Sequence, residues 1–540
     1  MRYSIIDAIG PFIDPSNTPK NWSKVPFSFY ENKKDLNVDF KRIINQFESF
    51  VQQIKKIGYN SITLDDLPHM VILDFYSTKD KQKISQFEQL YKKLIKISNK
   101  NNLKVFITFD LMYFNKEIEA HTQNKDNKII EVLKNNLTTL FEKYDIEGVI
   151  SRIGECDGID VKGIFKSKIT IKSPKQIKKY LTKLLPLFEK NNKKWIFRTW
   201  TIGGSKIGDL IWNKKTFSKV FKDINSPSLI ISMKYGVSDF FRNMDLNPLF
   251  FLGNHKKIIE LQTKREYDFF GEMPYYTGFD YEKYYNQLQN NEDLVGIMVW
   301  CQTGGWSESK KLTFLHNSSQ FTELNTISAI NIFKGKNAEE VKQYFNNPQM
   351  DIFFKKYNYL SERILYPKNH KELFLNKVFI PPIIWAYWGN ITINKVTSSF
   401  VNLYYDPIEI SDEEFIELKN SAIESGINDA DFYIDTLKIL YYCRKALHKE
   451  IEIEELNKRI NIYKENYSLL NFNIAKNNSS FIIKNLCRIF IRKKKEYRLI
   501  DKLVLNRSLA ILVKFYLLVN KNDKPSFVNQ QAMPLTKIIS

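Results

Sequence analysis

The stretch Leu229-Ile-Ile-Ser-Met-Lys-Tyr-Gly-Val-Ser-Asp239 and the later stretch Lys257-Ile-Ile-Glu-Leu-Gln-Thr-Lys-Arg-Glu-Tyr267 share one pattern. Each begins with an apolar run of strand length and ends in polar residues, with Asp239 just past the first run and Glu260 within the second. In parallel α/β folds the functional side chains gather at the C-terminal ends of the strands. Two carboxylates from successive strands therefore predict acid–base chemistry on a small polar substrate. A third candidate, Glu155, follows the apolar run that starts at Gly148.

Strand and helix patterns alternate through the first part of the chain. The predicted strands span 3–9, 60–64, 104–109, 148–153, 195–200, 229–234, 257–262 and 294–300, and the predicted helices between them include 38–57, 84–99, 127–144, 174–191, 215–223 and 280–290. Eight strands with intervening helices predict a (β/α)8 TIM barrel, and a doubly wound open sheet is the alternative. The first strand is not followed by a Gly-rich phosphate loop, which counts against a nucleotide-binding version of either fold.

The pattern becomes mainly helical after about residue 330. The predicted helices there are 338–346, 349–365, 411–425, 430–448, 453–465 and 499–519. We therefore expect two domains, a catalytic barrel over 1–330 and a helical C-terminal domain over 335–540.

The chain of 540 residues carries a net charge of +21, which leaves two interpretations open. One is an anionic partner, such as nucleic acid, a membrane surface or an acidic glycan. The other, which we favour, is a solvated surface of scattered lysines. The clearest basic cluster lies within 488–498. The segment 488–519 could lie on an acidic membrane surface, or it could be a helix that packs its apolar face inward.

The cysteines Cys156, Cys301, Cys443 and Cys487 are far apart and form no CxxC pair, so neither a zinc site nor a disulfide framework is indicated. His69 and His255 have no evident partner spacing, so no metal site is expected. The N-terminus lacks the pattern of a signal peptide, and no apolar run has the length of a membrane span. These features predict a cytoplasmic protein with reduced thiols.

Three motifs resemble the glycoside hydrolase family 67 α-glucuronidases. They are Met233-Lys-Tyr-Gly-Val-Ser-Asp-Phe-Phe241 with the nearby Asn247-Pro-Leu-Phe250, then Ile259-Glu-Leu-Gln-Thr-Lys-Arg-Glu-Tyr267, then Gly296-Ile-Met-Val-Trp-Cys-Gln-Thr-Gly-Gly-Trp306. Order, spacing and residue types agree across strands four to eight, and the family also has a helical C-terminal domain. The family's N-terminal β-domain has no counterpart here.

The resemblance implies an inverting hydrolase that needs no cofactor. It places Glu155 as the general acid, and Asp239 and Glu260 as the basic pair around the attacking water. An acid and a base on separate strands can lie roughly 6.5–9.5 Å apart, which leaves room for that water. The alternatives are a surface position for Glu155 and a loop cap for Asp239. Glu260 lies inside a strand, where an inward carboxylate is costly without a partner or a task.

Arg198 and Lys234 match basic positions that the family uses for the carboxylate of a uronic acid. The alternative is that both form structural ion pairs with Asp239 and Glu260. The family has a lysine four residues before its acid, where this chain has Ser151; Arg152 follows, and strand alternation points it the other way. The substrate could therefore be another acidic sugar or a neutral one.

Aromatic and polar side chains at the strand ends are candidates for the sugar platform. The predicted substrate-binding residues, besides Arg198 and Lys234, are Trp200, Tyr235, Gln262, Trp300 and Trp306, and Tyr267 is a further aromatic candidate. Asp65, Asp66 and Asp110 also lie at strand ends, where they could bind hydroxyl groups or cap the following loops.

The sequence thus predicts a cytoplasmic α-glucuronidase-like glycoside hydrolase acting on an acidic oligo- or polysaccharide. The alternative is a catalytically inactive barrel that serves as a carbohydrate-binding or scaffold protein. The resemblance also implies a homodimer formed through the C-terminal domain.

Overall fold

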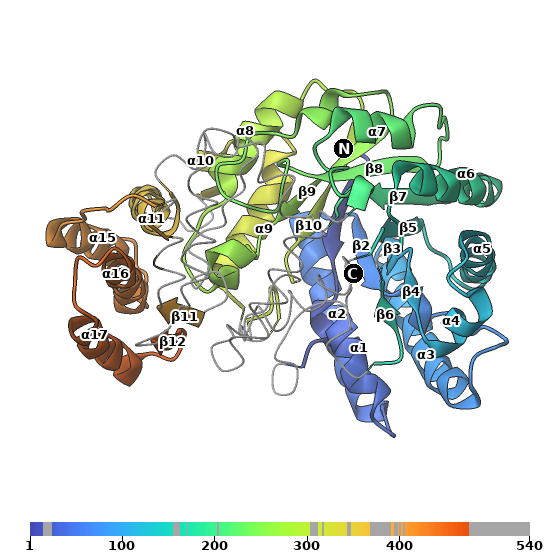
Figure 1. The fold of residues 1–540 in the computed structure, drawn as a ribbon, viewed down its shortest axis with the longest axis horizontal. Helices are drawn as coiled ribbons and strands as arrows, with labels where there is room; N and C mark the ends of the chain where they lie inside the picture. Colours follow the sequence, from blue (N-terminus) through green and yellow to red (C-terminus); the bar gives the residue numbers. More distant parts are fainter. Residues whose placement is uncertain are drawn as a thin grey trace, which may run out of the picture.

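The computed structural model describes residues 1–14, 24–154, 163–168, 170–201, 205–302, 311–315, 318–342, 347–367, 390–393, 398, 401–402 and 405–474. Eight parallel strands close into a barrel in the order β1-β10-β9-β8-β7-β5-β3-β2 (Figure 1). The strands are β1 (Tyr3–Asp7), β2 (Ser61–Asp65), β3 (Lys104–Asp110), β5 (Gly148–Arg152), β7 (Lys194–Arg198), β8 (Leu229–Lys234), β9 (Lys256–Gln262) and β10 (Leu294–Trp300). The predicted TIM barrel is confirmed.

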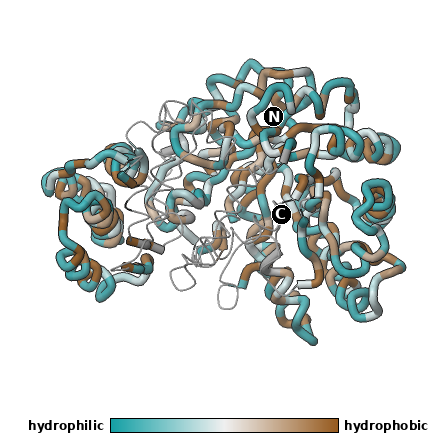
Figure 2. Tube along the Cα trace, in the orientation of Figure 1, coloured by the Kyte–Doolittle hydropathy of each residue, from teal (hydrophilic) through white to brown (hydrophobic). Residues whose placement is uncertain are grey.

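Amphipathic helices cover the outside of the barrel, and their apolar faces pack on the strands. In α2 (Asn37–Ile57) the buried residues Ile43, Phe47, Phe50, Val51 and Ile54 recur at helical spacing. Figure 2 shows hydrophobic and hydrophilic residues alternating along these outer helices. The others are α1 (Lys24–Glu31), α3 (Thr78–Lys100), α4 (Lys116–Thr122), α5 (Asp126–Lys143), α6 (Pro174–Lys190), α7 (Lys214–Phe221), α8 (Gly278–Leu288) and α9 (Gln320–Ile332). A short antiparallel pair, β4 (Tyr113–Phe114) and β6 (Lys166–Ser167), lies beside them.

A second group of helices lies to one side of the barrel (Figure 1). It comprises α10 (Ala338–Lys342), α11 (Gln349–Leu365), α15 (Asp412–Glu424), α16 (Ala430–Leu447) and α17 (Ile453–Asn466), with the parallel pair β11 (Asn390–Ile393) and β12 (Asn471–Ile474). The mainly helical C-terminal region is thus confirmed, whereas the domain boundary at 330–335 stays a prediction. The predicted helix 499–519 and the basic segment 488–519 lie outside the described residues. Within the described ranges, no helix is long and apolar enough to cross a membrane.

Helix α9 was not predicted, and its environment explains why. Residues around most of its circumference are buried, among them Phe321, Leu324, Asn325, Ser328 and Ile332. The helix packs against β10 on one side and against α8 and α10 on others. It therefore has no polar face to produce the 3.6-residue periodicity that marks a surface helix.

The strand pairing shows which side chains point into the barrel. Trp195 stacks on Phe188 of α6, and Phe197 contacts Phe221 of α7, so both face the helices. Successive strand residues alternate between faces, so Arg198 points inward. Paired residues on neighbouring strands share a face, and the pairs are Arg198–Ser232, Lys234–Glu260, Met298–Glu260 and Trp300–Gln262.

The same argument applied to β5 corrects the expectation for Ser151 and Arg152. Ser151 pairs with the outward-facing Phe197, and its Oγ accepts a hydrogen bond of 2.8 Å from Trp195 Nε1. Arg152 therefore points into the barrel, as does Asp110, its partner on β3. Strand alternation does place Ser151 and Arg152 on opposite faces, as expected, but Arg152 and not Ser151 faces the barrel interior.

A buried charge cluster connects the barrel to the C-terminal helices. Asp268 contacts Arg242 Nε through Oδ1 and lies 2.9 Å from Arg265 Nε through Oδ2. Arg242 Nη1 also donates to Ser361 Oγ in α11 at 2.7 Å, and Arg265 Nη1 lies 3.1 Å from Asp280 Oδ2. A buried charge without a partner is strongly destabilising, so this cluster holds its members in place.

We predict that Asp268→Asn destabilises the protein by about 3–5 kcal/mol, because two buried guanidinium groups lose their shared carboxylate. Urea unfolding followed by circular dichroism measures this. The matched control is Asp245→Asn, whose ion pair with Lys283 spans 2.9 Å with both side chains at least half exposed. The control should change stability by about 1 kcal/mol or less. Equal effects of the two changes would contradict the structural role of the cluster.

Candidate active site

Glu260 lies at the C-terminal end of the barrel and is, among the carboxylates described there, the most completely buried, with 0% of its surface exposed. Arg198 Nε donates to Oε1 and Oε2 at 3.0 and 3.1 Å, and Arg198 Nη2 donates to Oε2 at 2.7 Å. Ser232 Oγ donates to Oε1 at 2.9 Å and Trp300 Nε1 to Oε2 at 3.1 Å. Side chains from β7, β8 and β10 thus converge on one carboxylate from β9.

The net effect of these partners is to keep Glu260 ionised. Burial by itself raises the pKa of a carboxyl group, but the charge and hydrogen bonds of Arg198, the charge of Lys234 and the bond from Ser232 outweigh it. The pKa of Glu260 therefore lies below its ordinary value. The Arg198 guanidinium also lies over the Trp300 ring, with 4.5 Å from Cζ to the ring centroid.

Asp239 lies beside this group, in the loop that follows β8. Its Oδ1 accepts from Lys234 Nζ at 2.5 Å and from the backbone N–H of Phe240 at 2.9 Å. Its Oδ2 accepts from Tyr267 OH at 2.8 Å. The Asp239 side chain keeps 16% of its surface exposed, whereas Lys234 is buried. The Lys234 ammonium lies 3.2 Å from the centroid of the Trp200 ring.

Lys234 connects the two carboxylates, because it binds Asp239 and pairs along the sheet with Glu260. The structure thus brings together five of the predicted site residues, namely Glu260, Asp239, Arg198, Lys234 and Trp300, with Trp200 against Lys234. Arg198 and Lys234 adopt the second of the two roles considered for them, since each forms an ion pair with one of the carboxylates. Glu155 and Trp306 lie outside the described residues.

Two further candidates occupy different positions. Tyr235 is fully buried, stacks on Tyr284 of α8 and donates to the carbonyl of Phe241 at 2.8 Å, so it packs behind the strand and does not reach the barrel mouth. Gln262 faces the interior as the partner of Trp300 and is buried.

Polar residues at the other strand ends also have structural partners. Arg152 Nε donates to Asp110 Oδ1 at 2.6 Å. Asp7, which the sequence analysis did not select, accepts from the backbone N–H of Cys301 at 2.6 Å and from that of Gln302, and so orders the turn after β10. Asp7 was missed because the first strand was predicted over 3–9, whereas the observed β1 ends at Asp7.

His69 lies in a buried polar chain between two carboxylates. Its Nε2 is 2.7 Å from Glu31 Oε1, and its Nδ1 contacts Asp66 Oδ1. Glu31 Oε2 also accepts from the backbone N–H of Ile164 at 2.6 Å. The sequence analysis found no evident partner spacing for His69. Glu31 was missed because it lies on α1, a helix that was not predicted, whereas Asp66 lies only three residues before His69 and could have been recognised. Within the described part of the chain, no group of His, Cys, Asp or Glu is arranged to hold a metal ion.

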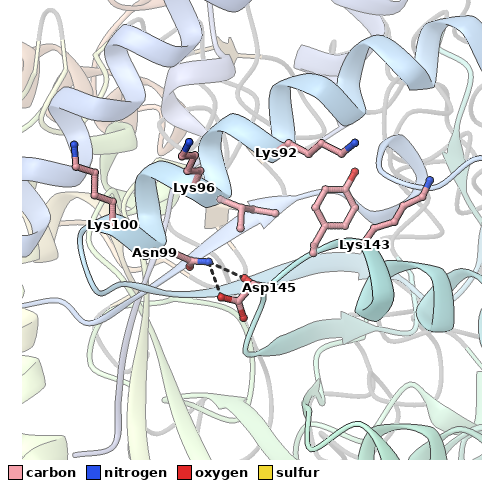
Figure 3. A pocket seen from close by; sticks show the side chains of 8 residues that line it. Lys92, Lys96, Asn99, Lys100, Lys143 and Asp145 are labelled. Atoms are coloured by element: carbon pink, nitrogen blue, oxygen red, sulfur yellow. Dashed lines mark hydrogen bonds between the residues drawn. The ribbon is translucent and has the colours of Figure 1, made fainter.

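A cavity of about 390 Å³ opens elsewhere, between α3 and the end of α5 (Figure 3). Its lining includes Lys92, Lys96, Lys100 and Lys143. Lys143 donates to Glu88 at 2.8 Å, and Asn99 donates to Asp145 Oδ2 at 3.0 Å. Lys100 ends α3 just before β3 begins, so this cavity lies toward the N-terminal ends of the strands, opposite the carboxylates.

Comparison with known proteins supports the fold. No protein-family model matches the sequence, and neither does any curated protein. The structure is similar to that of a GH138 enzyme targeting pectin rhamnogalacturonan II, with a TM-score of 0.50 and 11% identity over 86% of this chain. The match covers 61% of that enzyme, so this chain spans less than two thirds of its length.

Two other solved structures match less well. CpGH84B has a TM-score of 0.36 and 13% identity, with 78% of this chain and 68% of that chain covered. Dispersin B has a TM-score of 0.30 and 12% identity, with 54% and 95% covered. At 11% identity the likeness to the GH138 enzyme shows the barrel fold alone, and the resemblance to family 67 continues to rest on the sequence motifs.

Lys264 lies two residues past β9, and its pKa reports how strongly burial disfavours a charge at this end of the barrel. It is buried, and its Nζ donates to the carbonyl of Lys311 at 2.6 Å. Burial lowers its pKa from 10.5 to about 8, against the opposing charge of Glu272. Between these pH values the folded protein holds fewer protons than the unfolded chain, so stability rises with pH.

We predict that the wild type gains stability relative to Lys264→Met as the pH rises from about 8 toward 10.5. The penalty of the buried ammonium is fully present below pH 8 and disappears above 10.5. Urea unfolding of both proteins across this pH window measures the difference. A constant difference would mean that the pKa of Lys264 is unshifted, and a change in the opposite direction would mean that it is raised; either result would contradict the prediction.

Proposed function

We propose that the chain is a glycoside hydrolase that cleaves an α-linked acidic sugar by inversion, in the manner of an α-glucuronidase. The observation that supports this most is the ionised Glu260, held by Arg198 inside the C-terminal end of the barrel, with Asp239 beside it. Buried, ionised carboxylates at this end of a barrel are costly to maintain, and catalysis gives them a use. Trp200 and Trp300 supply ring faces next to the two cations.

Asp239 and Glu260 differ in exposure and in hydrogen bonding, which supports different roles for the two carboxylates. Asp239 is partly exposed and can contact a water molecule, whereas both oxygens of the fully buried Glu260 are occupied by Arg198, Ser232 and Trp300. Asp239 would then accept the proton of the attacking water. Glu260 would fix the position of Arg198 and, through the shared Lys234, the charge around Asp239.

The complete reaction needs an acid on the other side of the sugar. The resemblance assigns that role to Glu155, which would protonate the glycosidic oxygen as its bond to the anomeric carbon breaks. Water forms the new bond from the opposite face and passes its proton to Asp239, so the anomeric configuration inverts.

A second candidate function is carbohydrate binding by an inactive barrel. Its support is the complete engagement of Glu260 with Arg198, which is equally what a structural ion pair requires.

We predict that the wild type releases the β-anomer from α-glucuronosyl oligosaccharides, as followed by NMR. Asp239→Asn should lower kcat by about a hundredfold or more, because it removes a general base without changing the side-chain shape. Glu155→Gln should do the same for the acid. The control is Asp223→Asn, whose side chain is 70% exposed at the surface and which should keep wild-type activity.

If the Asp239→Asn variant keeps the turnover of the wild type, Asp239 is not the general base. If the wild type binds acidic sugars but turns over none of a panel of α-linked substrates, the carbohydrate-binding function is the correct one.

A further inference from the structure

The cavity between α3 and α5 concentrates positive charge that the proposed function does not use. Its lining contains four lysines and one aspartate, a formal excess of three positive charges. Lys92, Lys96 and Lys100 come from α3, and Lys143 comes from α5 (Figure 3). Four residues make about 6 Å of helix and bring side chains back to the same face. The three lysines of α3, called here the α3 lysines, therefore form a row along one wall of the cavity.

The carboxylates nearest to this row have other partners. Glu88 Oε1 accepts from Lys143 Nζ at 2.8 Å, and Asp145 Oδ2 accepts from Asn99 Nδ2 at 3.0 Å. Among the residues that the structure describes, the α3 lysines take part in no ion pair or hydrogen bond, and all three are exposed. Like charges four residues apart on a helix repel each other. An anion that bound the row would remove this repulsion.

The rest of the lining offers a ligand little besides charge. The amide nitrogen of Asn99 donates to both the side chain and the carbonyl of Asp145, at 3.0 and 3.1 Å. The Tyr144 hydroxyl donates to the carbonyl of Met70 at 3.2 Å, and Ile95 is apolar and buried. The volume of about 390 Å³ falls within the range of small-molecule sites, roughly 300–1,000 Å³. The cavity is therefore suited to a small ligand that is recognised by the number of its negative charges.

The charge excess indicates which anion fits. A sugar acid has one carboxylate and can neutralise one lysine, whereas a phosphoryl group carries about 1.5–2 negative charges at pH 7. Two or three linked phosphoryl groups thus match an excess of three charges. The lysine ammonium is a compact point charge on a flexible stem and commonly binds phosphate in proteins.

We propose that this cavity is a second binding site, which takes a small soluble anion with two or more linked phosphoryl groups. The site lies toward the N-terminal ends of the barrel strands and shares no residue with the carboxylate site at the other end. The inference therefore stands independently of the proposed hydrolase function.

The test is calorimetric titration of the full-length protein with inorganic tripolyphosphate at about 0.15 M salt, where charges more than about 8 Å apart are screened. Orthophosphate and glucuronate are the comparison ligands with less charge. The variant replaces all three α3 lysines by glutamine. The matched control replaces Lys175, Lys179 and Lys183 by glutamine, because these lysines have the same spacing on α6 but do not line the cavity.

We predict that the wild type and the α6 control bind tripolyphosphate equally and that the α3 variant binds it at least about tenfold more weakly, because charge-assisted contacts are lost. Orthophosphate and glucuronate should bind the wild type at least about tenfold more weakly than tripolyphosphate does. Tripolyphosphate should also raise the Tm of the wild type and of the control more than that of the α3 variant. Circular dichroism checks folding, and if the triple variant is unfolded, Lys96→Gln against Lys179→Gln gives the same comparison.

Four results would overturn the inference. They are no binding of tripolyphosphate to the wild type, an equal loss of binding in the α3 variant and the α6 control, equal affinities for tripolyphosphate and orthophosphate, and binding only to vesicles that contain a polyphosphorylated lipid. The second result would mean that the general positive charge of the protein attracts the anion. The last would mean a membrane-surface contact in place of a site for a soluble ligand.

Discussion

The ion pair between Arg198 and Glu260 is the interaction on which the C-terminal end of this barrel depends. An ionised carboxylate with no exposed surface is tolerated only when charge and hydrogen bonds replace water. Here Arg198 supplies the charge, and Ser232 and Trp300 supply further hydrogen bonds. These groups come from β7, β8, β9 and β10. Because all of them must reach Glu260 to neutralise its charge, they fix half of the barrel's strands relative to one another. The same requirement keeps the pKa of Glu260 low.

The pairing extends around the barrel in a regular way. Asp239 has Lys234, and Asp110 has Arg152, so each of these carboxylates has its own cation. The members of these pairs differ in exposure: the Glu260 side chain has no exposed surface, whereas Arg198, Asp239 and Arg152 keep 11%, 16% and 15% of theirs exposed.

The sequence predicted the barrel well because its strands and outer helices have distinct periodicities, and the carboxylates Asp239 and Glu260 were recognisable from their positions at strand ends. The facing of Arg152 was predicted wrongly, because a short run such as Gly148 to Arg152 alternates regularly but contains no residue that identifies the inward side. Only the neighbours decide it, through Phe197 and Trp195. Helix α9 was missed because it is buried on most sides. Of the two partners of His69, Glu31 was missed because it is distant in sequence, and Asp66 was missed although it lies three residues away.

We propose that an acidic sugar binds at the charged end of the barrel, and not in the lysine-lined cavity between α3 and α5. A crystal structure of the protein soaked with β-glucuronic acid, the product of inversion at an α-glucuronoside, tests this most directly. The proposed function predicts the sugar at the barrel mouth, with its anomeric hydroxyl near Asp239. Glucuronic acid found only against Lys92, Lys96 and Lys100, with the barrel mouth unoccupied, would contradict it.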